Sequence, residues 1–158
     1  MSNMKDAFKR AGYNVEEKTK TKLNPSPQAS ANFDLPDNYT EQAEQIILNL
    51  KKSMGRDYRD FTTSKIRNIL ALVSEIYNEI ILEANDDLSP HYVERIEYLK
   101  VRLVYESGRE PYVVKPFVEK AGLINLLNNI GSSRENFIKF ARYMEALVAY
   151  HRFHGGRD

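Results

Sequence analysis

Apolar residues recur at the three- and four-residue spacing of amphipathic helices along most of the chain, beginning near position 37. Over residues 40–54 these positions are Ala43, Ile46, Ile47 and Leu50. Over residues 64–84 they form a broader stripe, made of Ile66, Ile69, Leu70, Val73, Ile76, Tyr77 and Ile80. We therefore expect two helices, joined by a charged loop over residues 55–61, with Thr63 as the N-cap of the second.

A third helix is predicted from Ser89-Pro90. Proline suits the first helical position, because the N–H that it lacks would have no partner there. The helix is expected to end near Gly108. The residues expected on its buried face are Val93, Ile96, Leu99, Leu103 and Val104.

Two more helices complete the pattern. The fourth is expected over residues 113–130, with Pro116 in its first turn, since a proline further inside would break the helix. Gly131 ends it, because glycine readily adopts the left-handed conformation. A capping box at residues 132–135 then starts a fifth helix, which runs to about His154.

No stretch alternates with the two-residue period of a β-strand for long enough to predict one, and 7 glycines in 158 residues are few for a loop-rich β fold. The sequence therefore predicts an all-α protein, a five-helix bundle over residues 37–158. Residues 1–36 are expected to form a flexible tail and linker, disordered or ordered by a partner. The reason is that Pro25 and Pro27 punctuate a polar stretch without periodicity.

Composition excludes several classes of protein. The chain has no cysteine, which excludes disulfides, thiolate catalysis and cysteine-based metal sites. No apolar run approaches the ~20 residues of a membrane span, and the first residues lack the apolar core of a signal peptide. We expect a cytoplasmic protein with no membrane partner.

Charge is unevenly distributed, although the formal net charge is only +1. Residues 51–67 contain six bases and two acids, whereas residues 75–97 contain seven acids and, apart from a histidine, only Arg95 as a base. Such a chain can present a local positive surface and can stack on copies of itself, basic surface to acidic surface. The alternative is that both runs are ordinary solvated helix faces.

Two segments are candidates for binding a nucleic-acid backbone. At the start of the second helix, Lys65 and Arg67 accompany three hydroxyl residues at 62–64, beside the unpaired N–H groups of a helix N-terminus. The preceding basic segment, from the end of the first helix through the loop, adds an aromatic residue, Tyr58, and four cations, here called the loop cations: Lys51, Lys52, Arg56 and Arg59. The alternatives are a capped helix with two surface bases and a solubilising loop.

An enzymatic alternative rests on Glu75, Glu79 and Glu83, which are spaced to share one helix face. Carboxylate rows of this kind hold Mg²⁺ in all-α nucleotide pyrophosphohydrolases. These enzymes need further carboxylates from a second helix, where this chain offers only Glu94 and Glu97. An acidic solvent-facing surface is the simpler interpretation.

The two histidines near the carboxyl end, His151 and His154, are three residues apart, but no third metal ligand lies near them in the sequence. We therefore expect cationic caps for the carboxyl end of the fifth helix, and no metal or other cofactor. Arg109 lies in a corner between helices, which suits either an internal ion pair or a backbone contact.

Three sequence blocks in a fixed order form an unusual combination: TTSKIRN at 62–68, YESGRE at 105–110 and RYMEALVAYHRFHGG at 142–156. In these blocks the chain resembles the small subunit of the type III-A (Csm) CRISPR effector complex. The resemblance extends over about residues 38–158 and leaves the first 36 or so outside.

The resemblance implies a five-helix, non-catalytic, RNA-contacting subunit in antiviral defence. Copies would stack along the channel that holds the CRISPR guide RNA paired with its target RNA, and cleaving residues would belong to other subunits. Its partners would be these RNAs, copies of itself and other Csm subunits, including the large catalytic and the backbone subunit. The family's basic channel positions carry over to Lys65 and Arg67. The loop cations are less firmly assigned, because the loop sequence departs from the family pattern.

Overall fold

The computed structural model describes residues 33–158, which are almost entirely helical. The elements are α2 (Tyr39–Met54), the 3-10 helix η1 (Gly55–Arg59), α3 (Thr63–Ile80), α4 (Pro90–Arg109), α5 (Val114–Lys120), α6 (Leu123–Asn128) and α7 (Arg134–Phe153). No strand occurs among these residues, where the only β pairing is an isolated bridge between Asp87 and Ser133. The predicted all-α bundle is therefore confirmed.

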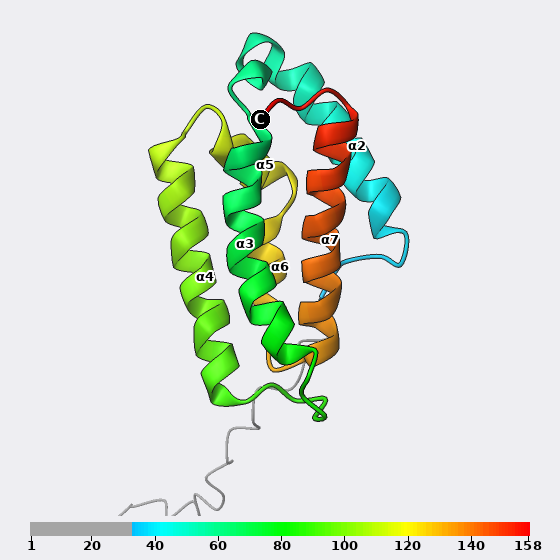
Figure 1. Ribbon diagram of the computed structural model, residues 1–158, viewed down its shortest axis with the longest axis vertical. Helices are drawn as coiled ribbons and strands as arrows, with labels where there is room; N and C mark the ends of the chain where they lie inside the picture. The colour runs from blue at the N-terminus through cyan, green and yellow to red at the C-terminus, as the bar shows by residue number, and fades with distance from the viewer. Residues whose placement is uncertain (1–32) are drawn as a thin grey trace, which may run out of the picture.

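The long helices α3, α4 and α7 lie side by side, with α3 in the middle (Figure 1). Helix α2 packs against the far side of α7, and the short helices α5 and α6 pack against α4. The chain ends beside the start of α3, so the carboxyl terminus and η1 lie at the same end of the bundle (Figure 1). This end also holds most of the predicted RNA-contacting residues.

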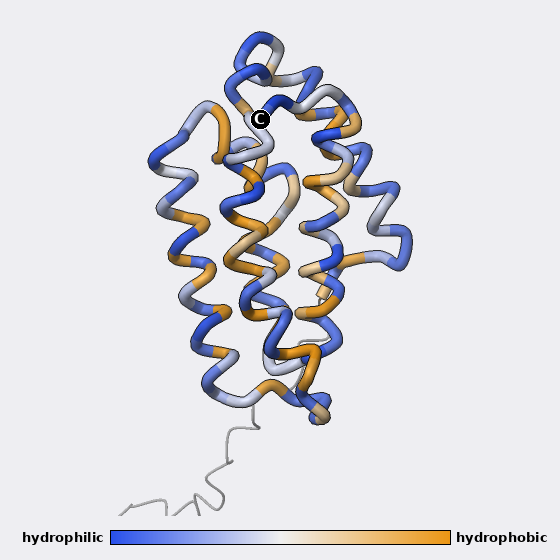
Figure 2. The backbone as a smooth tube through the Cα atoms, viewed as in Figure 1, coloured by the Kyte–Doolittle hydropathy of each residue, from blue (hydrophilic) through white to orange (hydrophobic). Residues whose placement is uncertain are grey.

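Apolar and polar residues alternate along each long helix (Figure 2), and the apolar ones form one continuous core. Its largest fully buried side chains include Phe61, Phe117, Phe137, Phe140 and Tyr143. The hydroxyl of Tyr143 donates a hydrogen bond to the carbonyl of Ala121 at 3.0 Å, and burial raises the pKa of this phenol. Only two polar residues among those described are fully buried, Thr63 and His151.

The third and fifth predicted helices match α4 and α7 closely, but the fourth is wrong in one respect. It is broken into α5 and α6 at Gly122, whose φ of 65° is left-handed and cannot continue a helix. Pro116 does lie in the first turn of α5. The predicted loop over residues 55–61 is mostly the 3-10 helix η1.

The second predicted helix ends four residues early, because α3 stops at Ile80. Arg134, at the start of α7, accounts for this end. Its guanidinium donates hydrogen bonds to the carbonyls of Ile80 and Ile81, both at 3.1 Å, and so satisfies acceptors that another helical turn would have used. The sequence pattern could not show this cap, since it comes from 54 residues away.

Three further local predictions need correction. Val104 is 61% exposed, so it does not belong to the buried face of α4. Thr63 is the first residue of α3, and Thr62 takes the N-cap position. The cap of α7 is Ser133, whose hydroxyl accepts from the backbone N–H of Asn136 at 3.2 Å, one residue later than the predicted capping box.

The predicted tail over residues 1–36 lies mostly outside the described residues. Within the part that is described, Leu35 is 5% exposed and belongs to the core, and Phe33 packs against it. The folded part of the chain thus includes apolar residues before position 37. Within residues 33–158, no helix combines the length and apolarity needed to span a bilayer.

Candidate nucleic-acid interface at the start of α3

The carboxyl terminus folds back over the first turn of α3. The backbone N–H of Thr63 donates a hydrogen bond to the carbonyl of Arg157 at 2.6 Å. One of the helix N–H groups that sequence reasoning assigned to a phosphate is therefore already paired within the chain. Side chains near this turn are further candidates for binding an anion.

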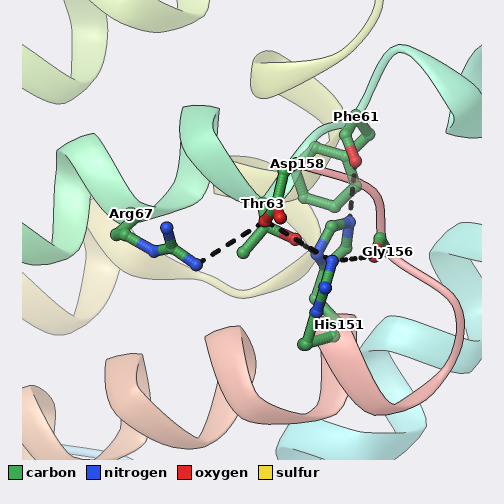
Figure 3. Close-up of polar contacts among 7 residues, drawn as sticks. Phe61, Thr63, Arg67, His151, Gly156 and Asp158 are labelled. Atoms are coloured by element: carbon green, nitrogen blue, oxygen red, sulfur yellow. Dashed lines mark hydrogen bonds and ion pairs between the residues drawn. The ribbon is translucent and has the colours of Figure 1, made fainter.

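His151 is fully buried beneath this turn, and both of its ring nitrogens have partners (Figure 3). Nε2 lies 2.7 Å from the carbonyl oxygen of Phe61, and Nδ1 lies 3.3 Å from the hydroxyl of Thr63. Because a carbonyl only accepts, Nε2 carries the proton, and neutral Nδ1 accepts from the threonine hydroxyl. The network joins the segment before α3 to the last turn of α7.

Burial lowers the pKa of His151, since the charged form would be desolvated. The hydrogen bond to Phe61 opposes this shift, and the adjacent charge of Arg152 reinforces it. His151 is thus a neutral core residue at pH 7, and its prediction as a cationic cap was wrong. His154 instead lies partly buried, with its Nε2 2.9 Å from a carboxylate oxygen of Glu44.

Lys65 and Arg67, the two cations that sequence reasoning placed first, lie near this turn but differ in their surroundings. The ammonium of Lys65 is 3.4 Å from the carboxylate of Glu110, and its side chain is 29% exposed. The side chain of Arg67 is 60% exposed, and its guanidinium is 3.8 Å from the carboxylate of Asp158. Both cations therefore reach the surface, and each has a carboxylate partner.

A third cation, Arg152, lies at this site through its contact with Asp158; sequence reasoning did not assign it there. The carboxylate of Asp158 lies 3.4 Å from Arg152 of α7 as well as close to Arg67 of α3 (Figure 3). The two guanidiniums converge on one carboxylate from different helices. An acidic side chain therefore occupies the place where two arginines together could hold an anion.

The four loop cations extend this surface. Lys51 and Lys52 end α2, and Arg56 and Arg59 belong to η1; all four are exposed. The ammonium of Lys51 donates a hydrogen bond to the carbonyl of His154 at 3.1 Å, which ties α2 to the end of α7. The elements that carry the six predicted cations meet at the η1 end of the bundle (Figure 1).

Tyr58 does not serve as the exposed aromatic that sequence reasoning expected in this loop. It is 8% exposed and packs against Phe61 and His151, with ring centroids 6.0 and 5.6 Å away. Burial also raises the pKa of its phenol. The loop therefore offers charge but no stacking surface from Tyr58.

The glutamate row of the enzymatic alternative is not a set of converging ligands. Glu75 and Glu79 both face Arg95 of α4, at 3.9 and 2.7 Å, and Glu83 lies beyond the end of α3, where it accepts from the hydroxyl of Tyr92 at 3.3 Å. The three residues therefore do not share one helix face, contrary to prediction. Across residues 33–158, no group of three or more His, Cys, Asp or Glu side chains is arranged to hold a metal ion.

Similarity to known proteins decides the family. Residues 40–157, from α2 to the carboxyl-terminal segment, match the family described as Csm2 Type III-A. This chain belongs to the Csm2 family. It is therefore a small subunit of a type III CRISPR complex.

Individual Csm2 proteins agree with this assignment over most of their length. The protein named CRISPR system Cms protein Csm2 from Mycobacterium tuberculosis is 40% identical over 124 residues, or 78% of this chain and 97% of the relative. The protein of the same name from Streptococcus thermophilus is 41% identical over 122 residues, or 77% and 95%. That from Enterococcus italicus is 33% identical over 123 residues, or 74% and 87%.

Sequence reasoning missed the contacts that shape this end of the Csm2 bundle, namely Thr63 with His151 and Asp158 with two arginines. One available signal was the pair of glycines after His154, because a chain that passes close to a ring needs a residue without a side chain. Gly156 is such a residue: a β-carbon there would collide with the His151 ring.

Proposed function

We propose that this chain is a non-catalytic RNA-contacting subunit, which stacks in several copies along the guide RNA paired with its target RNA. The supporting observation is that cations of α2, η1, α3 and α7 gather at one end of the bundle. Lys and Arg side chains on a rigid surface bind phosphates through charge, without reading base sequence. The expected partners are the two RNAs, other Csm subunits, including the large catalytic and the backbone subunit, and further copies of this chain, all in the cytoplasm.

The residues proposed to contact the RNA backbone are Lys65, Arg67, Lys51, Lys52, Arg56 and Arg59. To these the structure leads us to add Arg152, since it shares the carboxylate of Asp158 with Arg67. The proposed role is non-catalytic, because Glu75 and Glu79, two of the three glutamates that would have to hold a metal, both face Arg95. Nothing in the geometry favours the pyrophosphohydrolase alternative, so we do not propose it.

The test is RNA binding by the assembled complex that contains Lys65→Ala and Arg67→Ala together. We expect weaker binding of target RNA, and a slope of log affinity against log salt that is flatter by about one unit for each lost phosphate contact. The matched control is Lys115→Ala with Lys120→Ala, which removes two exposed charges from α5. If the complex assembles with the first pair and binds target RNA with unchanged affinity and salt slope, these residues are not the RNA contacts.

A further inference from the structure

A row of exposed tyrosines and arginines runs along the outward face of α4. It consists of Tyr98, Arg102, Tyr105 and Arg109, which follow one another at intervals of four, three and four residues and therefore share one side of the helix. The two tyrosines are 63% and 56% exposed, and the two arginine side chains are 40% and 56% exposed. None of these side chains contributes to the core.

The arginines in this row are held in place by a single carboxylate. Glu106 lies 3.6 Å from Arg102 and 3.5 Å from Arg109, and its own side chain is 18% exposed. The guanidinium carbon of Arg102 also lies 5.7 Å from the ring centroid of Tyr105, a cation–π contact. The row therefore keeps a net positive charge, and its tyrosine rings lie next to its arginines.

The two rings are seven residues apart, which is about 10 Å along a helix. They are therefore separate platforms along one line and do not form a compact aromatic cluster. Protein-binding surfaces concentrate their anchors near the centre of a patch. A linear series of rings alternating with cations suits a linear polyanion that carries flat bases.

Both ends of the row open into hollows, each lined by one further cation and by one or more carboxylates. Beside Tyr98 a groove of about 180 Å³ lies between α3 and α4, lined by Leu72, Glu75, Ile76, Arg95, Tyr98, Leu99 and Arg102. Beyond Arg109, the 77% exposed Tyr112 helps to line a second hollow of about 420 Å³. Lys65 also lines this hollow, together with Asp57, Asp60 and Glu110, so the row leads to the proposed backbone-contacting surface.

We propose that this face of α4 binds single-stranded RNA, with unpaired bases stacked on Tyr98 and Tyr105 and phosphates held by Arg102 and Arg109. Every base has a flat face, so such binding tolerates any sequence and depends strongly on salt. The bases of a guide–target duplex are already paired and stacked, and they cannot use these rings. The site therefore differs from the proposed duplex contact in the state of the strand that it accepts.

The chain has no tryptophan, so Tyr105→Trp introduces a unique fluorophore into the row while it keeps an aromatic platform. We expect a single-stranded oligouridylate to quench this fluorescence at low salt, and a duplex of equal length to do so far less. Tyr98→Ala in this background should weaken oligouridylate binding about 5- to 150-fold, since one base–ring stack contributes about 1–3 kcal/mol. Tyr98→Phe, which keeps the ring, should bind as tightly as Tyr98.

Three outcomes would overturn the proposal. The first is an unchanged affinity for oligouridylate after Tyr98→Ala and Tyr105→Ala together, measured by the anisotropy of a labelled oligouridylate because this variant has no tryptophan, with the fold confirmed by circular dichroism. The second is that Val101→Ser with Val104→Ser, at neighbouring exposed positions of α4, weakens oligouridylate binding as much as the tyrosine variants do, which would mean that the rings have no special role. The third is that the tyrosine variants keep RNA binding but lose association with protein subunits. The face would then be a protein-docking surface.

This test separates the present inference from the proposed function. If the α4 variants bind oligouridylate normally while Lys65→Ala with Arg67→Ala weakens target binding by the complex, only the α4 site is wrong. If the α4 variants lose oligouridylate binding while the lysine and arginine variant leaves target binding unchanged, the α4 site stands and the proposed duplex contact fails.

Discussion

Gly156 packs so closely on the imidazole ring of His151 that a β-carbon at this position would collide with the ring. The backbone N–H of Gly156 also donates a hydrogen bond to the His151 carbonyl at 2.8 Å. The terminal segment is thus held against the same residue that accepts from Thr63. One buried histidine thereby fixes how the chain end passes over the start of α3.

Gly156→Ala is expected to destabilise the protein by about 1–3 kcal/mol, because the added methyl group must displace the ring or the chain end. Chemical denaturation measures this change in the free energy of unfolding. Gly108→Ala is the matched control. Gly108 lies within α4, and a methyl group added there would meet open space, so alanine should be neutral or stabilise by about 0.5–1 kcal/mol. Equal effects of both substitutions would contradict the close packing at Gly156.

His151 should make the folded state sensitive to mild acid. Its pKa is lowered in the folded protein, whereas the unfolded chain has an ordinary histidine pKa of about 6.5. Below that pH the unfolded state takes up a proton that the folded state does not. Stability is therefore complete above about pH 6.5 and falls as the pH drops below it, by at most about 1.4 kcal/mol per pH unit.

Denaturation midpoints measured between pH 7.5 and 5 for the wild type and for His151→Gln isolate this contribution, since His91 and His154 are common to both proteins. Glutamine can donate to the Phe61 carbonyl and accept from Thr63, but it does not titrate. We expect the variant to lose less stability with falling pH. The slope of its free energy of unfolding against pH should be smaller by the amount that corresponds to the uptake of about one proton. Parallel curves would mean that His151 is protonated in the folded state.

The helices that sequence reasoning placed well are those whose own residues decide their limits. Pro90 starts α4 and an apolar periodicity of many turns defines α7, so local pattern is enough for both. The end of α3 and the break at Gly122 were missed for different reasons. The first depends on Arg134, far away in sequence, and a single glycine inside an apolar run costs a helix only about 1 kcal/mol.

The candidate site was predictable in its charges but not in its contacts. Lys65 and Arg67 are indicated by their place at a helix start and by the family resemblance. Thr63 and His151 are 88 residues apart, so no local periodicity relates them. An exposed and a buried tyrosine also look alike in sequence, which is why Tyr58 was misjudged.

The amino-terminal limit of the folded part can be located with two deletions. Removing residues 1–32 should change the melting temperature by no more than a few degrees, because their sequence has little apolar periodicity to contribute to the core. Removing residues 1–36 also removes Leu35, which is 5% exposed, and Phe33, which packs on the core. We expect a further fall of roughly 5–10 °C, from the loss of about 1.5–3 kcal/mol of apolar burial. A large drop with the shorter deletion would show that residues 1–32 contribute to the stability of the bundle.

Asp158→Asn should strengthen RNA binding by the assembled complex. The substitution removes the carboxylate that lies 3.8 Å from Arg67 and 3.4 Å from Arg152. RNA phosphates can then use Arg67 and those donors of Arg152 that do not bind the Gly156 carbonyl, which accepts from Nη1 of Arg152 at 3.0 Å. We expect a modest gain in affinity, with a slope of log affinity against log salt that is steeper by up to about one unit. Stability should hardly change, because the Asp158 side chain is 65% exposed and such ion pairs contribute little.

Glu119→Gln is the control for Asp158→Asn, since it removes one exposed carboxylate from α5 and alters net charge equally. A general effect of net charge would raise the affinity of both variants alike. A local effect raises it only for Asp158→Asn, and combining that change with Arg67→Ala and Arg152→Ala should abolish the gain. If Asp158→Asn still binds more tightly without the two arginines, its carboxylate acts on some other cation of the surface.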